Sequence, residues 1–189
     1  NLGKASALST DRIDVENAER YGITYVDENG DKKTPIILHN SPSGAIERCL
    51  YALLEKAAKM QREGKIPSIP FWLCPTQIRI IPLSQDFHDV SLGYLEELSS
   101  SGFRVDFDDR DLSVGKKVRE AEKEWLPFIL VIGKNEVENK NFQVRNRYSG
   151  KIITMSLVEL IEHCKKLSNG MIRDELPLSR FISDRLQFK

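Results

Sequence analysis

Three residues that lie close together in the chain, His39, Gly44 and Arg48, are of types that can bind a metal ion and a phosphate. A neutral imidazole offers a lone pair to Zn²⁺, and the planar guanidinium of an arginine is always charged and suits a phosphate group. A glycine lets the backbone lie close to a nucleotide, because it has no side chain. Each residue alone also has an ordinary explanation: a lone histidine is more often structural, and Arg48 could pair with Glu47 or Glu55 on a helix surface.

The residues around these three predict the elements that position them. Residues 34–39 predict a strand that ends at the histidine, whereas residues 43–62 repeat apolar side chains at helical spacing. A turn rich in Pro and Gly joins the two runs. An Asn-Gly pair at 29–30 separates the β-rich run 22–27 from 34–39, which predicts a hairpin between these runs. The pattern is therefore a strand, a turn and a helix, with the arginine in the first turn of the helix.

Residues 35–55 resemble motif 3 of the class II aminoacyl-tRNA synthetases, and specifically the threonyl-tRNA synthetase family in its archaeal type. In that family the strand ends on a zinc-binding histidine and an ATP-binding arginine follows, as Arg48 follows His39 here. The resemblance implies that His39 is one ligand of Zn²⁺, with the other ligands upstream of Asn1. It also implies that Arg48 is catalytic, because it would hold ATP, bound with Mg²⁺, and stabilise charge on the transferring phosphorus.

An earlier segment, residues 8–14, resembles the strand of the same family that lines the threonine and adenine pockets. The resemblance implies that Thr10 and Arg12 contact substrate, and that Ser43 at the start of the helix does so as well. The bacterial-type pattern of the family has glutamine where this chain has Arg12.

A second set of candidate residues lies in the run 103–133 and just after it. A strand leads into an acidic turn, Gly115 and two lysines open a charged helix, and Pro127 precedes an apolar strand. The aspartates could form a solvated turn or, less often, a divalent-ion site, and the lysines an ordinary exposed helix start. The aspartates are Asp106, Asp108, Asp109 and Asp111.

This run resembles the anticodon-binding domain that the threonyl-, prolyl-, histidyl- and glycyl-tRNA synthetases share. Unpaired bases are read through hydrogen bonds to their exposed edges, for which Asp, Glu and Arg supply acceptors and donors. The resemblance implies base contacts from Asp111, Glu136 and Arg145, and phosphate contacts from Lys117 and Arg119. Many relatives have asparagine at the position of Asp111, and an ionised carboxylate cannot donate a hydrogen bond.

The second half of the sequence alternates strand and helix patterns, which favours an α/β domain. We predict the end of an antiparallel class II synthetase catalytic domain over residues 1–68, including motif 3, and a mixed-sheet α/β anticodon-binding domain over residues 69–189. Two prolines in 64–70 indicate the boundary, and the tail 176–183 is expected to be extended and to pack back on the domain. The predicted elements are strands at 77–83, 103–107 (with Asp106 on its polar side), 128–132 and 142–147, and helices at 87–100, 114–125 and 156–167.

The composition limits the class of protein. The 189 residues include 28 basic and 28 acidic side chains, so a nucleic-acid site must be local, and no stretch approaches the length of a membrane span. Cys49, Cys74 and Cys164 are widely spaced without a paired-ligand pattern, which argues against a disulfide framework and favours a reducing cytoplasm. The first residues show no signal-peptide core and no initiator methionine, so we expect the sequence to begin inside a longer protein.

Two motif matches in family order support one functional hypothesis. The resemblance implies an enzyme of protein biosynthesis that ligates threonine to tRNA(Thr) with ATP and is a homodimer at full length, with no role for DNA or a membrane. Motifs 1 and 2 are not in the chain, so we expect the chain alone to be inactive. Two alternatives stay open: a non-catalytic tRNA- or RNA-binding accessory protein with the same anticodon-binding fold, and a small α/β module for protein–protein contacts.

Overall fold

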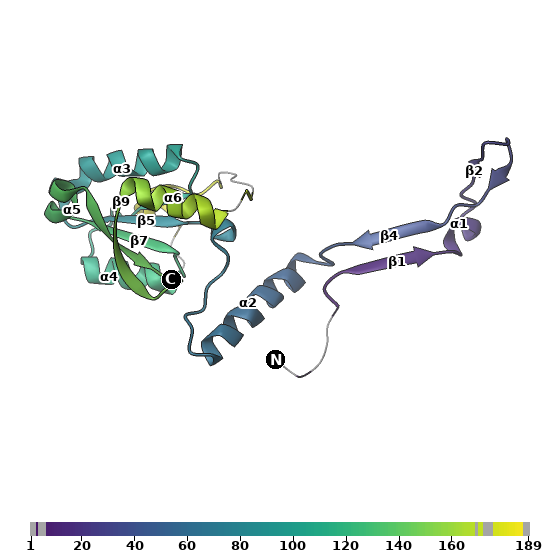
Figure 1. Cartoon of the computed structure of the whole chain (residues 1–189), viewed down its shortest axis with the longest axis horizontal. Coiled ribbons are helices and arrows are strands. Elements are labelled where there is room, and N and C mark those ends of the chain that lie inside the picture. Colours follow the sequence, from purple (N-terminus) through teal and green to yellow (C-terminus); the bar gives the residue numbers. More distant parts are fainter. Residues whose placement is uncertain (1–2, 4–6, 169, 172–175, 187–189) are drawn as a thin grey trace. The chain divides into compact units, whose positions relative to one another are not determined.

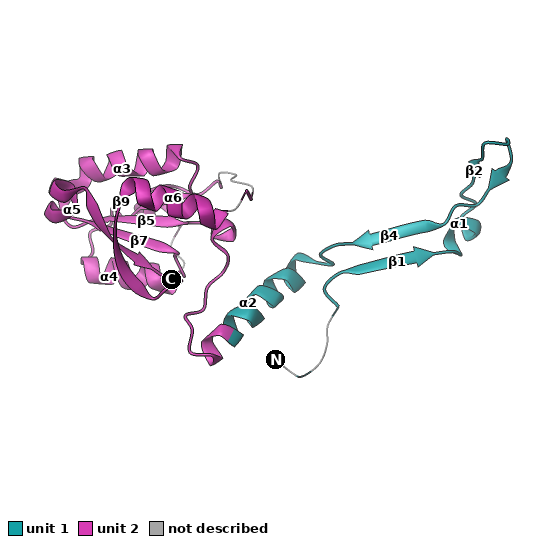
Figure 2. Ribbon diagram, in the orientation of Figure 1, with its two compact units in different colours: residues 1–59 teal, residues 60–189 magenta. Residues whose placement is uncertain are grey.

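The chain divides into two compact units, residues 1–59 and 60–189 (Figure 2). The computed structural model describes residues 3, 7–168, 170–171 and 176–186 (Figure 1). The predicted boundary, after residue 68, lies in the segment that follows helix α2 (Ile46–Arg62). Each unit is therefore considered by itself.

The first unit is built on a β-ribbon and most of α2. In the ribbon, β1 pairs antiparallel with β4, so that Arg12 lies opposite His39 and Thr10 opposite Ser41. A separate short hairpin joins β2 to β3 across a turn that the Asp27 carboxylate closes by accepting the backbone N–H groups of Asn29 and Asp31. The elements are β1 (Thr10–Asp14), α1 (Asn17–Arg20), β2 (Tyr25–Val26), β3 (Lys32–Lys33) and β4 (Ile37–Ser41).

The predicted hairpin between residues 22–27 and 34–39 is wrong in its second strand. Lys32 and Lys33 pair with the first strand instead, and β4 starts only at Ile37. The hairpin ends there because Pro35 has no backbone N–H with which to continue the ladder. The chain then passes on to pair with β1, which was predicted as a strand but without a partner.

The first unit has almost no core of its own. Among its described residues only Ala18 and Ala57 are buried, whereas Ile13, Leu38 and Ile46 are 69%, 75% and 76% exposed. A two-stranded ribbon with such apolar faces is marginally stable by itself in water. The ribbon and the apolar side of α2 therefore have the character of one layer of a larger domain.

The second unit contains a five-stranded mixed sheet in the order β6-β5-β7-β8-β9. The first three strands of this order are parallel, and β8 and β9 continue the sheet antiparallel. The predicted mixed-sheet α/β fold is confirmed. The strands are β5 (Ile78–Pro82), β6 (Val105–Phe107), β7 (Phe128–Ile132), β8 (Asn141–Asn146) and β9 (Lys151–Ser156).

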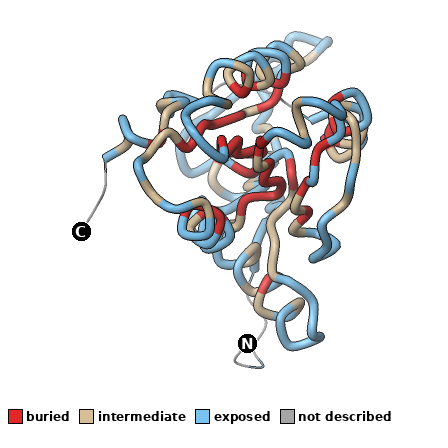
Figure 3. The backbone as a smooth tube through the Cα atoms, turned by 90° about the vertical axis from the view of Figure 1, so that its left-hand side faces the viewer, coloured by how far each residue is buried: buried red, intermediate tan, exposed pale blue. Residues whose placement is uncertain are grey.

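Helices cover both faces of this sheet, and Figure 3 shows the buried segments gathered between them. One face packs Ile80, Phe128 and Leu130 against α3 and α6, and the other packs Ile81 and Ile129 against α4. The helices are α3 (His88–Ser100), α4 (Val114–Lys123), α5 (Lys134–Asn139) and α6 (Leu157–Ser168), with 3₁₀ turns η1 (Phe71–Leu73), η2 (Gln85–Phe87) and η3 (Ile182–Asp184).

Two elements of the second unit were not predicted. Helix α5 is only six residues long, too short for a periodic pattern. Strand β9 follows β8 through a turn in which Asn146 Oδ1 accepts the backbone N–H groups of Tyr148 and Ser149, and Gly150 has φ +68°. The Ser149-Gly150 pair was the available signal for this hairpin.

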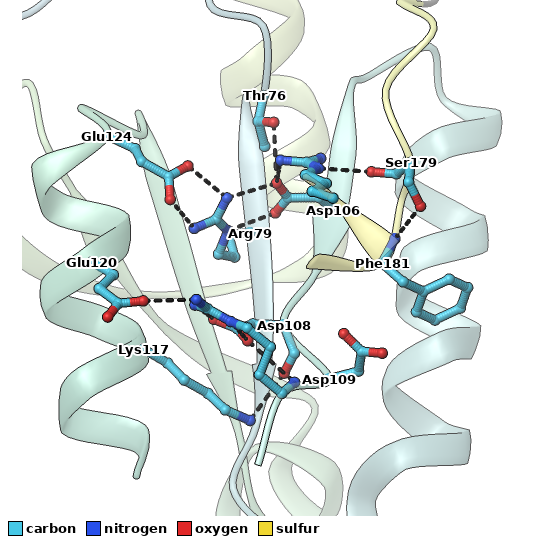
Figure 4. A network of polar contacts seen from close by, with 12 residues as sticks. Thr76, Arg79, Asp106, Asp108, Asp109, Lys117, Glu120, Glu124, Ser179 and Phe181 are labelled. Carbon is cyan, nitrogen blue, oxygen red and sulfur yellow. Dashed lines mark hydrogen bonds and ion pairs between the residues drawn. The ribbon is translucent and has the colours of Figure 1, made fainter. Parts of the chain in front are cut away.

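A buried ion pair joins the two parallel strands β5 and β6 (Figure 4). Arg79 is 0% exposed and donates through Nε and Nη2 to both carboxylate oxygens of Asp106, each at 2.8 Å. Its other donors reach Glu124 after α4, at 3.0 and 2.8 Å. Asp106, expected on the polar side of its strand, is 1% exposed because it pairs with Arg79 and also accepts a hydrogen bond from Thr76.

The acidic partners of Arg79 keep its guanidinium charged. Burial alone would lower the pKa of Arg79, but the hydrogen bonds and charges of Asp106 and Glu124 outweigh burial and raise it. The guanidinium therefore stays charged inside the sheet, and a buried charge whose partner is removed is strongly destabilising.

We predict that Arg79→Ala lowers the free energy of unfolding by about 3–5 kcal/mol, because it leaves the Asp106 carboxylate buried and without its bidentate partner. Glu124→Ala is the matched control, since Glu124 is 49% exposed and Asp106 still neutralises Arg79 after its removal. The control should cost less than about 2 kcal/mol. Urea unfolding followed by circular dichroism measures both, and equal costs would contradict the role given to the Arg79–Asp106 pair.

Candidate nucleic-acid interface

The loop between β6 and α4 is held by a second set of buried ionic contacts. Asp108 is 0% exposed and accepts hydrogen bonds from Arg110 Nε at 2.8 Å and Nη2 at 2.6 Å. Arg110 Nη1 also donates to Glu120 on α4, at 2.7 Å. This network was not predicted, because its members lie on separate elements and read individually as solvated charges. The solvated-turn interpretation is therefore wrong for Asp106 and Asp108.

Lys117 belongs to the same set of contacts (Figure 4). Its Nζ donates to the backbone carbonyl of Asp108 at 3.0 Å, and the residue is only 6% exposed. Lys116 and Arg119, on the same helix, are exposed. Lys117 therefore fixes the loop to α4 and offers little surface for a phosphate, whereas its two basic neighbours offer much more.

A hollow of about 150 Å³ opens at the carboxyl ends of β5 and β6. Ligands of open α/β sheets commonly bind outside the carboxyl ends of parallel strands. Asp111 is exposed at this hollow, so a carboxylate acceptor faces solvent there. The polar and charged residues that line this hollow include His88, Asp109, Arg110, Asp111 and Lys117.

Glu136 lies beyond the end of β7, in the first turn of α5. Its Oε2 accepts the backbone N–H of Gly133 at 3.1 Å, which closes the start of the helix. The residue is half-buried, so its carboxylate is oriented by the backbone and not free to rotate.

Arg145 lies on β8, directly opposite Ile129 and Ile152, and so on the sheet face that α4 partly covers. It lines a second hollow, of about 290 Å³, in which its Nη1 is 4.0 Å from Glu122 Oε1. The apolar floor includes Leu126 and Ile129. This hollow combines a donor, an acceptor and an apolar surface, which is the set of contacts that a splayed-out base needs.

Arg147 borders the same hollow but is engaged elsewhere. Its Nε donates to the carbonyl of Pro67 at 2.8 Å and its Nη1 to the carbonyl of Glu122 at 2.8 Å, and its guanidinium lies 5.2 Å from the ring centre of Trp125. Burial lowers the pKa of Arg147. Arg147 therefore ties the sheet end to α4 and to residue 67.

Three of the five residues predicted to contact tRNA line one of the two hollows, and the other two lie outside them. Asp111 and Lys117 line the hollow where α4 begins, and Arg145 lines the hollow near the end of α4, beside Glu122. Arg119 lies on α4, and Glu136 lies on α5, which follows β7. Glu122 is a candidate contact that the sequence did not reveal, because its partner on β8 is distant in sequence.

The motif 3 candidates gather on β1, β4 and the start of α2. His39 and Arg12 are both exposed on adjacent strands, and Arg12 Nη2 is 3.9 Å from Asp14 Oδ2. Thr10 and Ser43 are exposed as well, the first beside the end of β4 and the second just before α2.

Gly44 and Arg48 meet the chain that leads into β1. Arg48 Nη1 donates to the carbonyl of Ala7 at 3.3 Å. Gly44 has φ +66°, and a Cβ at this position would lie 2.9 Å from the carbonyl oxygen of Leu8. Only glycine fits this backbone conformation and this approach without strain, so the turn that presents Arg48 depends on Gly44.

No group of three or more His, Cys, Asp or Glu side chains that could hold a metal ion occurs among the described residues. The residues present fit at most one ligand of a zinc site, His39. The cysteines form no disulfide, and burial raises the pKa of Cys74 to about 11 and that of Cys164 to about 12. In the part of the chain that the structure describes, no helix is long and apolar enough to cross a membrane.

Comparisons with known proteins agree with this arrangement. Residues 77–167 match the family model described as "Anticodon binding domain". A threonine–tRNA ligase of Nitrosopumilus maritimus is 51% identical over 99% of this chain and 30% of its own length, and one of Pyrococcus furiosus is 50% identical over the whole chain and 30% of its own length. Among solved structures, the RNA binding domain of threonyl-tRNA synthetase from Cryptosporidium parvum Iowa II matches with a TM-score of 0.69 and 25% identity, over 88% of this chain and 40% of that one.

The mixed sheet and the matched family model define residues 77–167 as an anticodon-binding domain of the class II synthetase type. The chain belongs to the threonyl-tRNA synthetase family and spans about 30% of the length of the curated relatives that it matches. The predicted resemblance to the threonyl-tRNA synthetase family and the predicted anticodon-binding domain are confirmed, whereas the assignment of motif 3 stays a prediction.

We predict that Lys117→Ala lowers the free energy of unfolding by about 1–3 kcal/mol, because it removes the buried donor to the Asp108 carbonyl. Lys116→Ala removes an exposed lysine at the adjacent position and should change stability by less than about 0.5 kcal/mol. Thermal and urea unfolding of the two variants measures the difference. Similar stabilities would show that Lys117 does not hold the loop.

Proposed function

We propose that this chain is the part of a threonine–tRNA ligase that supplies motif 3 and the anticodon reader. The observation that carries the proposal is the identity of about 50% to threonine–tRNA ligases across the whole chain, in a sequence that also holds an anticodon-binding domain. The partners of the complete enzyme are then tRNA(Thr), threonine and ATP.

In RNA binding, residues of α4 contribute affinity, and residues of β8 and α5 contribute specificity. The exposed Lys116 and Arg119 bind backbone phosphates, which orient the anticodon loop but carry no sequence information. Arg145 donates hydrogen bonds to a base edge, and Glu136 accepts them with a carboxylate that is already oriented by the N–H of Gly133.

Lys117 and Asp111 have different parts in this recognition. Lys117 is a positioning residue, because its ammonium group is used to hold the carbonyl of Asp108. Asp111 is exposed at the hollow beyond β6 and, as a carboxylate, accepts a hydrogen bond from a base amino group.

On the catalytic side, the motif 3 residues serve the first step of aminoacylation. In that step the carboxylate of threonine attacks the α-phosphorus of ATP, and pyrophosphate leaves. The tRNA ribose hydroxyl then attacks the adenylate, and AMP leaves. Arg48 holds the triphosphate and neutralises charge that develops on the phosphorus, while Thr10, Arg12 and Ser43 line the substrate side.

His39 is one zinc ligand in this proposal, and the remaining ligands come from outside the described residues. Bound Zn²⁺ would supply recognition of the amino and hydroxyl groups of threonine. The exposed apolar faces of β1, β4 and α2 support the proposal that these elements belong to a larger catalytic domain, because the rest of such a domain would cover them.

We predict that Arg145→Ala and Glu136→Ala each weaken binding of tRNA(Thr) to the complete enzyme by about 1–3 kcal/mol, roughly 5- to 150-fold, because each removes a base contact. Arg119→Ala should weaken binding of all tRNAs alike and reduce the salt slope by about 1. Filter binding or anisotropy at several salt concentrations measures these effects.

Lys165→Ala is the matched control for lost positive charge, because Lys165 is exposed on α6, which covers the other face of the sheet. The control should bind as the parent does. If Arg145→Ala and Glu136→Ala also bind as tightly as the parent, the anticodon assignment is wrong.

We predict that Arg48→Ala in the complete enzyme lowers threonine-dependent pyrophosphate exchange about 100-fold or more, because a charge-stabilising donor is lost. His39→Ala should lower both the exchange rate and the zinc content per enzyme. Lys56→Ala, an exposed substitution on the same helix α2, should leave both unchanged. Survival of exchange in the Arg48 and His39 variants would refute the catalytic assignment and favour a non-catalytic RNA-binding protein.

A further inference from the structure

The C-terminal segment 179–185, called here the clasp, lies along the outer edge of β6. The backbone N–H of Phe107 donates to the carbonyl of Arg180 at 2.8 Å, and Phe107 forms an isolated parallel bridge with Phe181. The rings of these two phenylalanines meet edge to face, with centroids 5.9 Å apart, and Ile182 is buried. The expected packing of the tail on the domain is confirmed, and the clasp acts as a partial sixth strand.

Beyond this edge the clasp reaches the loop of residues 108–112, called here the recognition loop. The backbone N–H of Ser183 donates to Asp109 Oδ1 at 3.0 Å, and its hydroxyl donates to Oδ2 of the same carboxylate. Arg185 Nη1 lies 2.9 Å from Asp106 Oδ2, so the clasp also contacts the carboxylate that pairs with Arg79. Two acidic residues three positions apart, one on β6 and one in the recognition loop, are thus held by one short segment.

The first two residues of the recognition loop are held by different partners. Arg110 and Lys117 hold Asp108 from the side of α4. Ser183 holds Asp109 from the opposite side, and Asp111 follows two residues later at the hollow. Burial would raise the pKa of Asp109, but the hydrogen bonds from Ser183 and the charge of His88 lower it, so the carboxylate stays ionised as an acceptor.

We propose that the clasp is a positioning element for base recognition, in which Ser183 holds the recognition loop so that Asp111 faces the RNA. This inference rests on the proposed anticodon-binding function. Without Ser183 the loop has more conformations to lose on binding, and this ordering cost weakens the contact of Asp111 with its base. Phosphate contacts on α4 are unaffected, so selectivity among tRNAs falls more than overall affinity does.

The test compares Ser183→Ala, which removes the hydroxyl donor, with Ser183→Thr, which keeps it. Arg180→Ala is the matched control within the clasp, because the Arg180 side chain pairs with the exposed Glu96 and its carbonyl remains to accept from Phe107. The complete enzyme is titrated with tRNA(Thr) and with the same tRNA carrying a substituted anticodon. The measured quantity is the ratio of the two Kd values.

We expect Ser183→Ala to lower this ratio roughly 5-fold, which corresponds to the net contribution of one typical hydrogen bond. Ser183→Thr and Arg180→Ala should keep the ratio of the parent. A variant Ser183→Ala that melts earlier but discriminates as well as the parent would overturn the inference and leave the clasp a purely structural segment. A parent enzyme that does not discriminate between the two tRNAs would instead refute the proposed anticodon reading itself.

Discussion

The pairing of Arg79 with Asp106 is the constraint on which the rest of the second unit depends. It places two opposite charges between parallel strands, where each compensates the other, and the Arg79 guanidinium also pairs with Glu124 at the end of α4. The strands that it joins end at the hollow beyond β6, and the helix that it recruits carries the exposed basic residues. The orientation of the candidate RNA-binding surface therefore follows from an interaction that no RNA touches.

Acidic residues in and before the loop that follows β6 also hold the structure in place. Asp106, Asp108 and Asp109 are successive acidic residues that are all engaged within the protein. Asp106 pairs with β5 and with the C-terminal segment, Asp108 with the loop and α4, and Asp109 with the C-terminal segment. Each uses its charge for position, which leaves Asp111 as the exposed carboxylate of the four. An acidic turn in a tRNA-binding domain is thus compatible with RNA, because most of its charge is neutralised within the protein.

Local patterns predicted those parts of the fold that local physics determines. The amphipathic run of α2 and the apolar runs of β5 and β7 were found from spacing alone, and the family resemblance supplied their order. The partner of β4 was not found, because the pairing of residues 10–14 with residues 37–41 depends on Pro35 ending the nearer hairpin. The burial of Lys117 was hidden as well, since it depends on a carbonyl that only the folded loop presents.

The unequal cores of the two units have a consequence for how the chain behaves as a polymer. The second unit closes its own sheet between helices, whereas the described part of the first buries only two alanines. Heat or denaturant applied to the chain by itself should thus report the melting of the second unit, while the first contributes little enthalpy and little cooperativity. A unit with so little buried surface gains stability when further structure packs on its exposed apolar faces.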